Sequence, residues 1–231
     1  MNNIKDYREK ELKNYVIGNI LFVILLSGLI DEETLKNFKL DDLSSLAALF
    51  PFATLPAVVY LYVFLLDSLV PGENKQKLAY MGIGHLPGCT IFSDIKAGCI
   101  DRRLNVEKAK EKYKDIYVKM PEKKKERRVY ENSSWYEIYS KYSNKPKIYY
   151  ANKDYLLCRD ITVMTIFLLI AYLLVIAFSD ELKFDIKVLV LFLVEFLLSN
   201  YAMRGKASRL AYNIIAEDLY NEDKKNEWNC K

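Results

Sequence analysis

The chain has 231 residues, of which 52% are hydrophobic and 28% are charged, and its formal net charge is +4. These averages combine two populations, because long stretches carry no charge at all, whereas residues 71–159 hold 20 basic and 11 acidic side chains. Such segregation argues against a single soluble domain and is typical of a membrane protein with a basic aqueous part.

Four apolar stretches are the first predicted elements. A membrane-spanning helix takes about 20 predominantly apolar residues. We therefore predict spans at about residues 15–30, 46–70, 161–179 and 186–203. Pro51 and Pro56 each remove an intrahelical hydrogen bond, so the second span is expected to be kinked.

The distribution of basic residues predicts the orientation of these spans. Of the 34 Lys and Arg residues, all but Lys36, Lys39, Lys183 and Lys187 lie in the two tails or between the second and third spans. Lys and Arg accumulate on the cytoplasmic side of a membrane, so both termini and the long connection are expected to be cytoplasmic. We predict a multi-pass protein of the bacterial inner (plasma) membrane, with an N-terminal hairpin at 1–70, a basic cytoplasmic insert at 71–158, a second hairpin at 159–203 and a cytoplasmic C-terminal helix at 204–231.

The insert is expected to be mainly helical, which makes the fold an all-α integral membrane protein. Asn105 is placed to cap a helix over residues 106–117, and Pro121 to begin the next. Ser133 or Ser134 is expected to cap a further helix, because Glu137 stands three residues after Ser134 in the capping-box position.

Both spans of the second hairpin are predicted to continue into the cytoplasm as helical stalks. The chain from about Lys147 is expected to run as one helix into the third span. The fourth span is expected to continue past Arg204, since apolar residues recur there at helical spacing.

The sequence indicates neither a catalytic site nor a metal or cofactor site. His85 is the only histidine, and no metalloprotease, hydrolase or dinucleotide-binding motif occurs. The cysteines have no CxxC spacing and are expected to be free thiols, namely Cys89, Cys99, Cys158 and Cys230. An enzyme acting on lipid phosphates would need clustered carboxylates, and the best available are scattered: Asp94, Asp101 and Asp160.

Glu195 interrupts the fourth apolar stretch, about 12 Å along the helix from Lys187 at 1.5 Å per residue. An ionisable residue at that depth marks a functional site by default. One interpretation is that Glu195 and Asn19 line or close a pore, which requires a homo-oligomer because four packed helices leave no wide channel. The alternative is a protonated glutamate that joins helices by hydrogen bonds to Asn19, Ser27 or Thr165.

A second group of residues combines positive charge with aromatic rings. Cations neutralise phosphate and aromatic faces stack on bases, so this mixture suits a nucleotide or an oligonucleotide. The alternative is a solvated, lipid-attracting face with aromatic packing. The candidate anion-binding residues are Arg102, Arg103, Lys123, Lys124, Lys125, Arg127, Arg128, Trp135 and Tyr136.

Four motifs occur in a characteristic order: LPGCTIF from Leu86, IDRRL from Ile100, NSSWYEIYSKY from Asn132 and YLLCRD from Tyr155. With Arg209 and Asn213 after the last span, this order resembles a group of uncharacterised bacterial four-helix membrane proteins. The resemblance covers about residues 86–213 and implies no established chemistry. The insert here is rich in lysine, whereas members of this group are rich in arginine. Small membrane effectors of bacterial anti-phage defence systems have a similar layout.

Two functional hypotheses follow from these patterns. The first is a non-enzymatic, oligomeric membrane effector, a ligand-gated channel or pore, in which Arg159 and Asp160 couple the insert to the third span or only mark the interface. The second is a membrane-anchored scaffold that recruits a cytosolic protein partner. Both leave the chain in contact with membrane lipids and without a cofactor.

Overall fold

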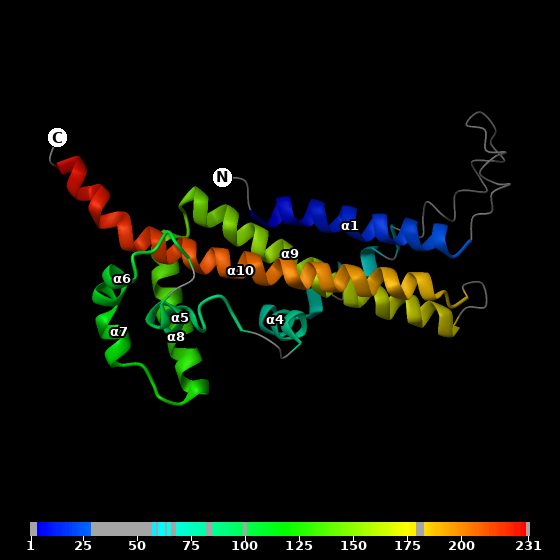
Figure 1. The fold of residues 1–231 in the computed structure, drawn as a ribbon. Helices are drawn as coiled ribbons and strands as arrows, with labels where there is room; N and C mark the ends of the chain where they lie inside the picture. The colour runs from blue at the N-terminus through cyan, green and yellow to red at the C-terminus, as the bar shows by residue number, and fades with distance from the viewer. Residues whose placement is uncertain are drawn as a thin grey trace. The chain divides into compact units, whose positions relative to one another are not determined.

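The computed structural model describes residues 4–28, 57–58, 60–62, 64–65, 68–81, 85–98, 101–178 and 183–229, with the backbone alone for residues 4–9 and 222–229. These described residues form helices and turns and no strand, so the predicted all-α class is confirmed. The helices (Figure 1) are α1 (Ile4–Leu26), α4 (Gly72–Tyr80), α5 (Ile91–Ala97), α6 (Val106–Lys112), α7 (Lys114–Val118), α8 (Lys124–Tyr142), α9 (Pro146–Phe178) and α10 (Ile186–Asn229).

Two of the described helices, α9 and α10, are long and apolar enough to cross a membrane. They have 33 and 44 residues, and at 1.5 Å per residue each is longer than the bilayer core of about 30 Å. Core helices of soluble proteins can be as apolar, but they are mostly buried. Only 39% and 22% of the apolar windows of α9 and α10 are buried, which favours a membrane protein.

The other two predicted spans have different outcomes. The first lies on α1, but this helix begins earlier than predicted, at Ile4, because the charged residues of the N-terminal tail are good helix formers. It ends at Leu26, and Gly28 follows in the left-handed conformation with φ 65°, as is common after a helix end. The predicted span at 46–70 lies largely outside the described residues.

The chain divides into two compact units. Unit 1 comprises residues 1–79 and 157–201, and unit 2 comprises residues 80–156 and 202–231. The helices α9 and α10 contribute residues to both units, as the predicted stalks require.

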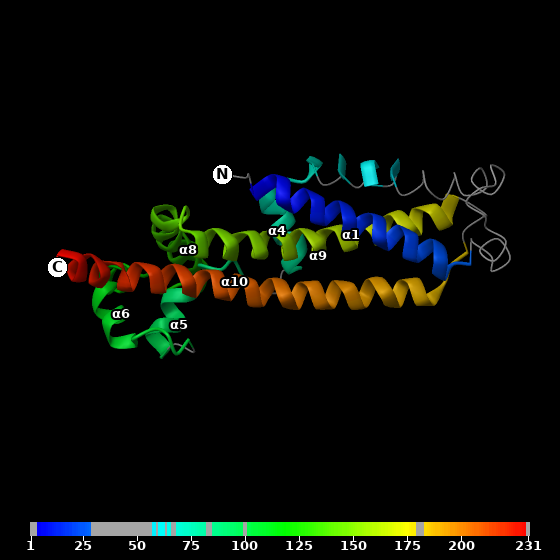
Figure 2. The same ribbon diagram turned by 90° about the horizontal axis from the view of Figure 1, so that it is seen from above.

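Unit 1 contains α1 beside the second part of α9 and the first part of α10 (Figures 1 and 2). One stripe of α1 is buried, at a spacing of four residues: Leu12, Val16, Ile20 and Ile24. The outward faces instead expose large apolar side chains, such as Leu25 at 53%, Leu174 at 51% and Leu197 at 57%. Water would disfavour such a surface, whereas lipid would not.

Unit 2 contains α5 to α8 with the first part of α9 and the last part of α10. Its core is formed by side chains from α5, α6, α8, α9 and α10, including Phe92, Ile95, Ile138, Ile148, Ile214 and Leu219, whereas α7 has no buried residue. The predicted cap at Asn105 is confirmed, since its side chain accepts a 3.0 Å hydrogen bond from the backbone of Lys108. The predicted helix over 106–117 is wrong in one respect, because it divides at Tyr113 into α6 and α7.

The predicted caps at Ser133 and Ser134 are wrong. Helix α8 passes through both serines without interruption, from Lys124 to Tyr142. Glu131, Trp135 and Ile138 are all buried, and their spacing puts them on one helical face, so burial outweighs the local capping signal. The preceding helix start is also displaced, since α8 begins at Lys124 rather than at Pro121.

Gly88 packs directly against Trp135 of α8. A Cβ atom at Gly88 would lie 2.7 Å from Trp135 Cβ and 2.8 Å from its ring, and Trp135 Cβ is fixed by the helix. Gly88→Ala is therefore expected to destabilise unit 2 by about 1–3 kcal/mol through overpacking, measured by thermal unfolding in detergent. Gly205→Ala is the control: its Cβ meets nothing within 4 Å, so this change should be neutral or stabilising. Equal melting temperatures for the two variants would contradict the close contact.

Candidate functional site

A polar cluster lies within the helices of unit 1. The hydroxyl of Tyr15 donates a 2.7 Å hydrogen bond to Glu195 Oε2 and lies 2.8 Å from Thr165 Oγ1. One residue from each of α1, α9 and α10 is thus joined in one network. Asn19, which is 7% exposed, donates instead to the backbone carbonyl of Tyr15.

The partner of Glu195 differs from those considered from the sequence, where Asn19, Ser27 and Thr165 were named. Tyr15 precedes Asn19 by four residues and therefore shares its helical face, a signal that could have identified it. The bond allows Glu195 to join helices, and interhelical hydrogen bonds in membranes contribute about 0.6 kcal/mol on average. Whether it also lines a pore stays a prediction.

Arg159 and Asp160 form an ion pair with each other. Arg159 Nε donates to Asp160 Oδ1 at 2.8 Å, and the second guanidinium contact is 2.6 Å. Both residues are buried, at 8% and 0% exposure. Successive helix residues do not normally face each other, so the long arginine side chain bends back to its neighbour. The attraction offsets part of the cost of burying the two charges. Their coupling role stays a prediction.

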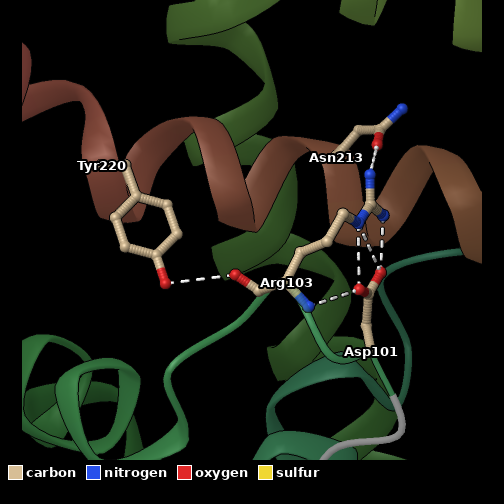
Figure 3. Close-up of polar contacts among 4 residues, drawn as sticks. All are labelled: Asp101, Arg103, Asn213 and Tyr220. Carbon is tan, nitrogen blue, oxygen red and sulfur yellow. Dashed lines mark hydrogen bonds and ion pairs between the residues drawn. The ribbon is translucent and has the colours of Figure 1, made fainter.

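Arg103 is held in a turn against α10 of unit 2 (Figure 3). Its backbone and guanidinium donate to the Asp101 carboxylate, and a further guanidinium nitrogen donates to Asn213 Oδ1 at 2.8 Å. Tyr220 donates to the carbonyl of Arg103 at 3.1 Å and accepts from the backbone N–H of Asn105 at 3.0 Å. The turn is therefore fixed to two positions on α10.

The charges of this turn act on each other. Hydrogen bonds from Arg103 lower the pKa of Asp101 below its ordinary value of 3.8, and the Asp101 carboxylate raises the pKa of Arg103. Both groups are thus ionised at neutral pH.

A groove with a volume of about 940 Å³ lies beside this turn within unit 2. Arg102 and Arg103 both line it, so the structure brings these two predicted residues to one site. Lys147 and Arg209 also line the groove but were missing from the predicted anion-binding set. The complete lining is Asp94, Asp101, Arg102, Arg103, Lys147, Gly205, Ser208, Arg209, Tyr212 and Asn213.

The other predicted basic residues lie at the start of α8. Lys123, Lys124 and Lys125 are exposed, whereas Arg127 and Arg128 are half-buried. Lys123 forms an exposed ion pair with Glu126 at 3.3 Å. No hydrogen bond or ion pair among the described residues joins this cluster to Arg102 or Arg103.

The pKa of His85 reflects desolvation and the positive charge near the start of α8. Its pKa is lowered below the ordinary value of 6.5, first by desolvation and then by the charges of Arg128, Lys124 and Arg204. Basic residues of α8 and α10 therefore contribute to one region of positive potential within unit 2.

The two predicted aromatic residues differ in availability. Trp135 is 6% exposed and stacks on Tyr139, with ring centroids 5.6 Å apart and planes inclined by 13°. Tyr136 is 59% exposed and tilted against Tyr139. Only the Tyr136 ring is therefore open to solvent, although a ligand contact at either residue stays a prediction.

Candidate metal ligands and cysteine thiols can be located only within the described residues. Among the described residues, no group of His, Cys, Asp or Glu could hold a metal ion. Cys89 and Cys158 form no disulfide there, whereas Cys99 and Cys230 lie outside the described residues. Of the scattered carboxylates, Asp94 and Asp101 share the groove of unit 2, and Asp160 is buried beside Arg159 in unit 1.

No protein-family model, curated protein or solved structure matches this chain. The resemblance to bacterial four-helix membrane proteins therefore remains a prediction from motif order.

Proposed function

We propose that this chain is a subunit of an oligomeric effector of the bacterial inner membrane, with four spans and cytoplasmic termini. Its basic cytoplasmic part would sense an anionic nucleotide or oligonucleotide and open a channel or pore, as an antiviral defence effector would. The observation that carries this proposal is that α9 and α10 each continue unbroken from an apolar, span-length segment into unit 2. A rigid helix can transmit a displacement along its length.

The polar cluster of unit 1 offers an element on which such a displacement could act. Tyr15, Thr165 and Glu195 come from three different helices and are linked by two short hydrogen bonds. A shift of α9 or α10 would break these bonds and release the Glu195 carboxyl. In an assembly of several copies, the released group would line the conducting path.

A second candidate function is a membrane-anchored scaffold for a cytosolic protein. It is favoured by the hydrogen bond of Glu195 to Tyr15 in the same chain, since a glutamate that only joins helices needs no pore and no second copy. Under this alternative, membrane permeability would not depend on any ligand.

The proposal predicts ligand-dependent leakage from liposomes of phosphatidylethanolamine and phosphatidylglycerol that contain the full chain. ATP and an oligoadenylate serve as probes, and release of an entrapped dye is measured. Glu195→Gln and Tyr15→Phe should each change the stimulated rate severalfold without reducing insertion, because each weakens the same hydrogen bond. Tyr201→Phe, which removes the same hydroxyl from an α10 tyrosine that is 81% exposed, is the matched control and should leave the rate unchanged.

Leakage that no probe alters, in the presence of correctly inserted protein, would contradict the channel and favour the scaffold. If both cluster variants changed the rate no more than Tyr201→Phe does, Glu195 would not take part in gating.

A further inference from the structure

The groove of unit 2 has the composition of a phosphate site. Four basic and two acidic side chains line it, so that its net charge is +2, and Ser208 and Tyr212 add hydroxyl groups. Phosphate oxygens are bound in proteins by arginine, lysine and such hydroxyl donors. With about 940 Å³, the groove also has room for more than the phosphate itself.

Three of its four cations are uncommitted. Arg102, Lys147 and Arg209 are exposed, and none forms a hydrogen bond or an ion pair with another described residue. They come from three separate segments, namely the turn before α6, the first turn of α9 and the middle of α10. Like charges converge here at an electrostatic cost, which a bound anion would relieve.

The fourth cation, Arg103, is already occupied by an anion of the chain. The two Asp101 oxygens accept from Nε and from one terminal nitrogen of Arg103, as a bidentate phosphate would (Figure 3). Asn213 orients the other terminal nitrogen. A phosphate with two charges and three oxygens is a stronger acceptor than a carboxylate, so it can compete with Asp101 for the same edge of Arg103.

Gly205 lines the groove and leaves open space beside it. A Cβ there would meet no atom within 4 Å. A larger side chain at this position would fill the space without removing a charge, and it would not strain a helix in which glycine is the less favourable residue.

We propose that this groove binds a terminal phosphate dianion through Arg102, Arg103, Lys147 and Arg209, with Asp101 as the internal competitor that the ligand displaces. This proposal gives the anion-sensing function proposed above a specific binding site. It rests on that function only for the biological role of the site. The phosphate can belong to a soluble nucleotide or to a lipid headgroup. Arg209 lies only six positions after Met203, the last residue of the predicted fourth span, so both sources are within reach.

Isothermal titration of the detergent-solubilised full chain with ATP tests the soluble source, and flotation with vesicles of phosphatidylcholine with or without phosphatidic acid tests the lipid source. We expect one of these probes to bind. Arg209→Ala should weaken that binding about tenfold or more, the loss expected for one charge-assisted hydrogen bond. Gly205→Leu should abolish it while far-ultraviolet circular dichroism stays unchanged, and Asp101→Asn should strengthen it severalfold.

Lys141→Ala provides the matched control, because Lys141 is an exposed lysine of α8 away from the groove lining, and its removal should not affect binding. The proposal is overturned if neither probe binds, if Gly205→Leu binds as well as the unchanged chain, or if Lys125→Ala weakens binding while Arg209→Ala does not. If a probe binds but causes no leakage, the channel function is contradicted and the phosphate site in the groove is supported. If ATP still stimulates leakage in Gly205→Leu, the phosphate site in the groove is contradicted and the channel function is supported.

Discussion

Replacing Glu131 with alanine is expected to destabilise unit 2 by about 3–5 kcal/mol. Glu131 belongs to α8 and is 1% exposed. Its carboxylate accepts from the backbone N–H groups of Phe92 and Ser93, at 2.9 and 3.0 Å, and from the Ser93 hydroxyl. Without it, donors at the N-terminus of α5 would be buried with no acceptor, and the favourable charge at that helix end would also be lost.

Hydrogen–deuterium exchange of the segment 91–97 measures this effect, with acceleration by about a hundredfold to several thousandfold expected in Glu131→Ala. The exchange rate in Glu131→Gln should fall between those of the unchanged chain and Glu131→Ala, since one side-chain oxygen of the glutamine still accepts a hydrogen bond. Glu137→Ala is the matched control, because Glu137 is an exposed glutamate of the same helix. Exchange no faster than in this control would show that Glu131 does not hold α5.

The contact of Glu131 with α5 illustrates what the sequence could not predict. Thr90 occupies the N-cap of α5, yet its side chain forms no capping bond and donates instead to Asp94. The cap comes from a glutamate 38 and 39 positions away. Local capping patterns fail where a tertiary contact supplies the acceptor. At Ser133 and Ser134 the pattern fails for another reason, because burial of one face of α8 extends this helix through both serines.

The predictions that depended on long, uniform patterns were the accurate ones. The third and fourth apolar segments were predicted to continue as helices beyond the spans, and α9 and α10 confirm this continuation. The side of the membrane on which these extensions lie stays a prediction. The cap at Asn105 was also correct, because it depends only on neighbouring residues. The four-span topology stays a prediction, because among the described helices α9 and α10 alone are long and apolar enough to span a membrane.

The candidate site was only partly accessible to sequence analysis. Arg102 and Arg103 were identifiable because they are adjacent and basic. Lys147 and Arg209 were not, since an isolated lysine or arginine in a helix is usually a solvated residue. Their membership of the groove follows from packing of the turn at 101–103 against α10, through Asn213 and Tyr220, and neither contact has a signature in the sequence.

Asp218→Ala is expected to destabilise unit 2 by about 3 kcal/mol or more. Asp218 lies on α10 and is 7% exposed. It accepts hydrogen bonds from the hydroxyls of Tyr113 at 2.8 Å and Tyr142 at 3.0 Å, and Lys112 lies 3.4 Å away. Three partners from two segments, the end of α6 and the end of α8, depend on this carboxylate. Glu126→Ala is the control, because its ion pair with Lys123 joins two exposed side chains and should contribute only about 0–1 kcal/mol.

The same contacts predict that unit 2 loses stability at alkaline pH. Burial, and then the charge of Asp218, raises the pKa of Tyr142 from 10.0 to about 12 and raises that of Tyr113 further. A raised pKa means that the stabilisation is complete below pH 10 and disappears as pH rises towards and beyond 12. Phenolate absorbance and circular dichroism should therefore change together above pH 10. In Asp218→Ala the tyrosines should ionise at lower pH, because the neighbouring negative charge is gone; ionisation at an unchanged pH in this variant would show that Asp218 does not control them.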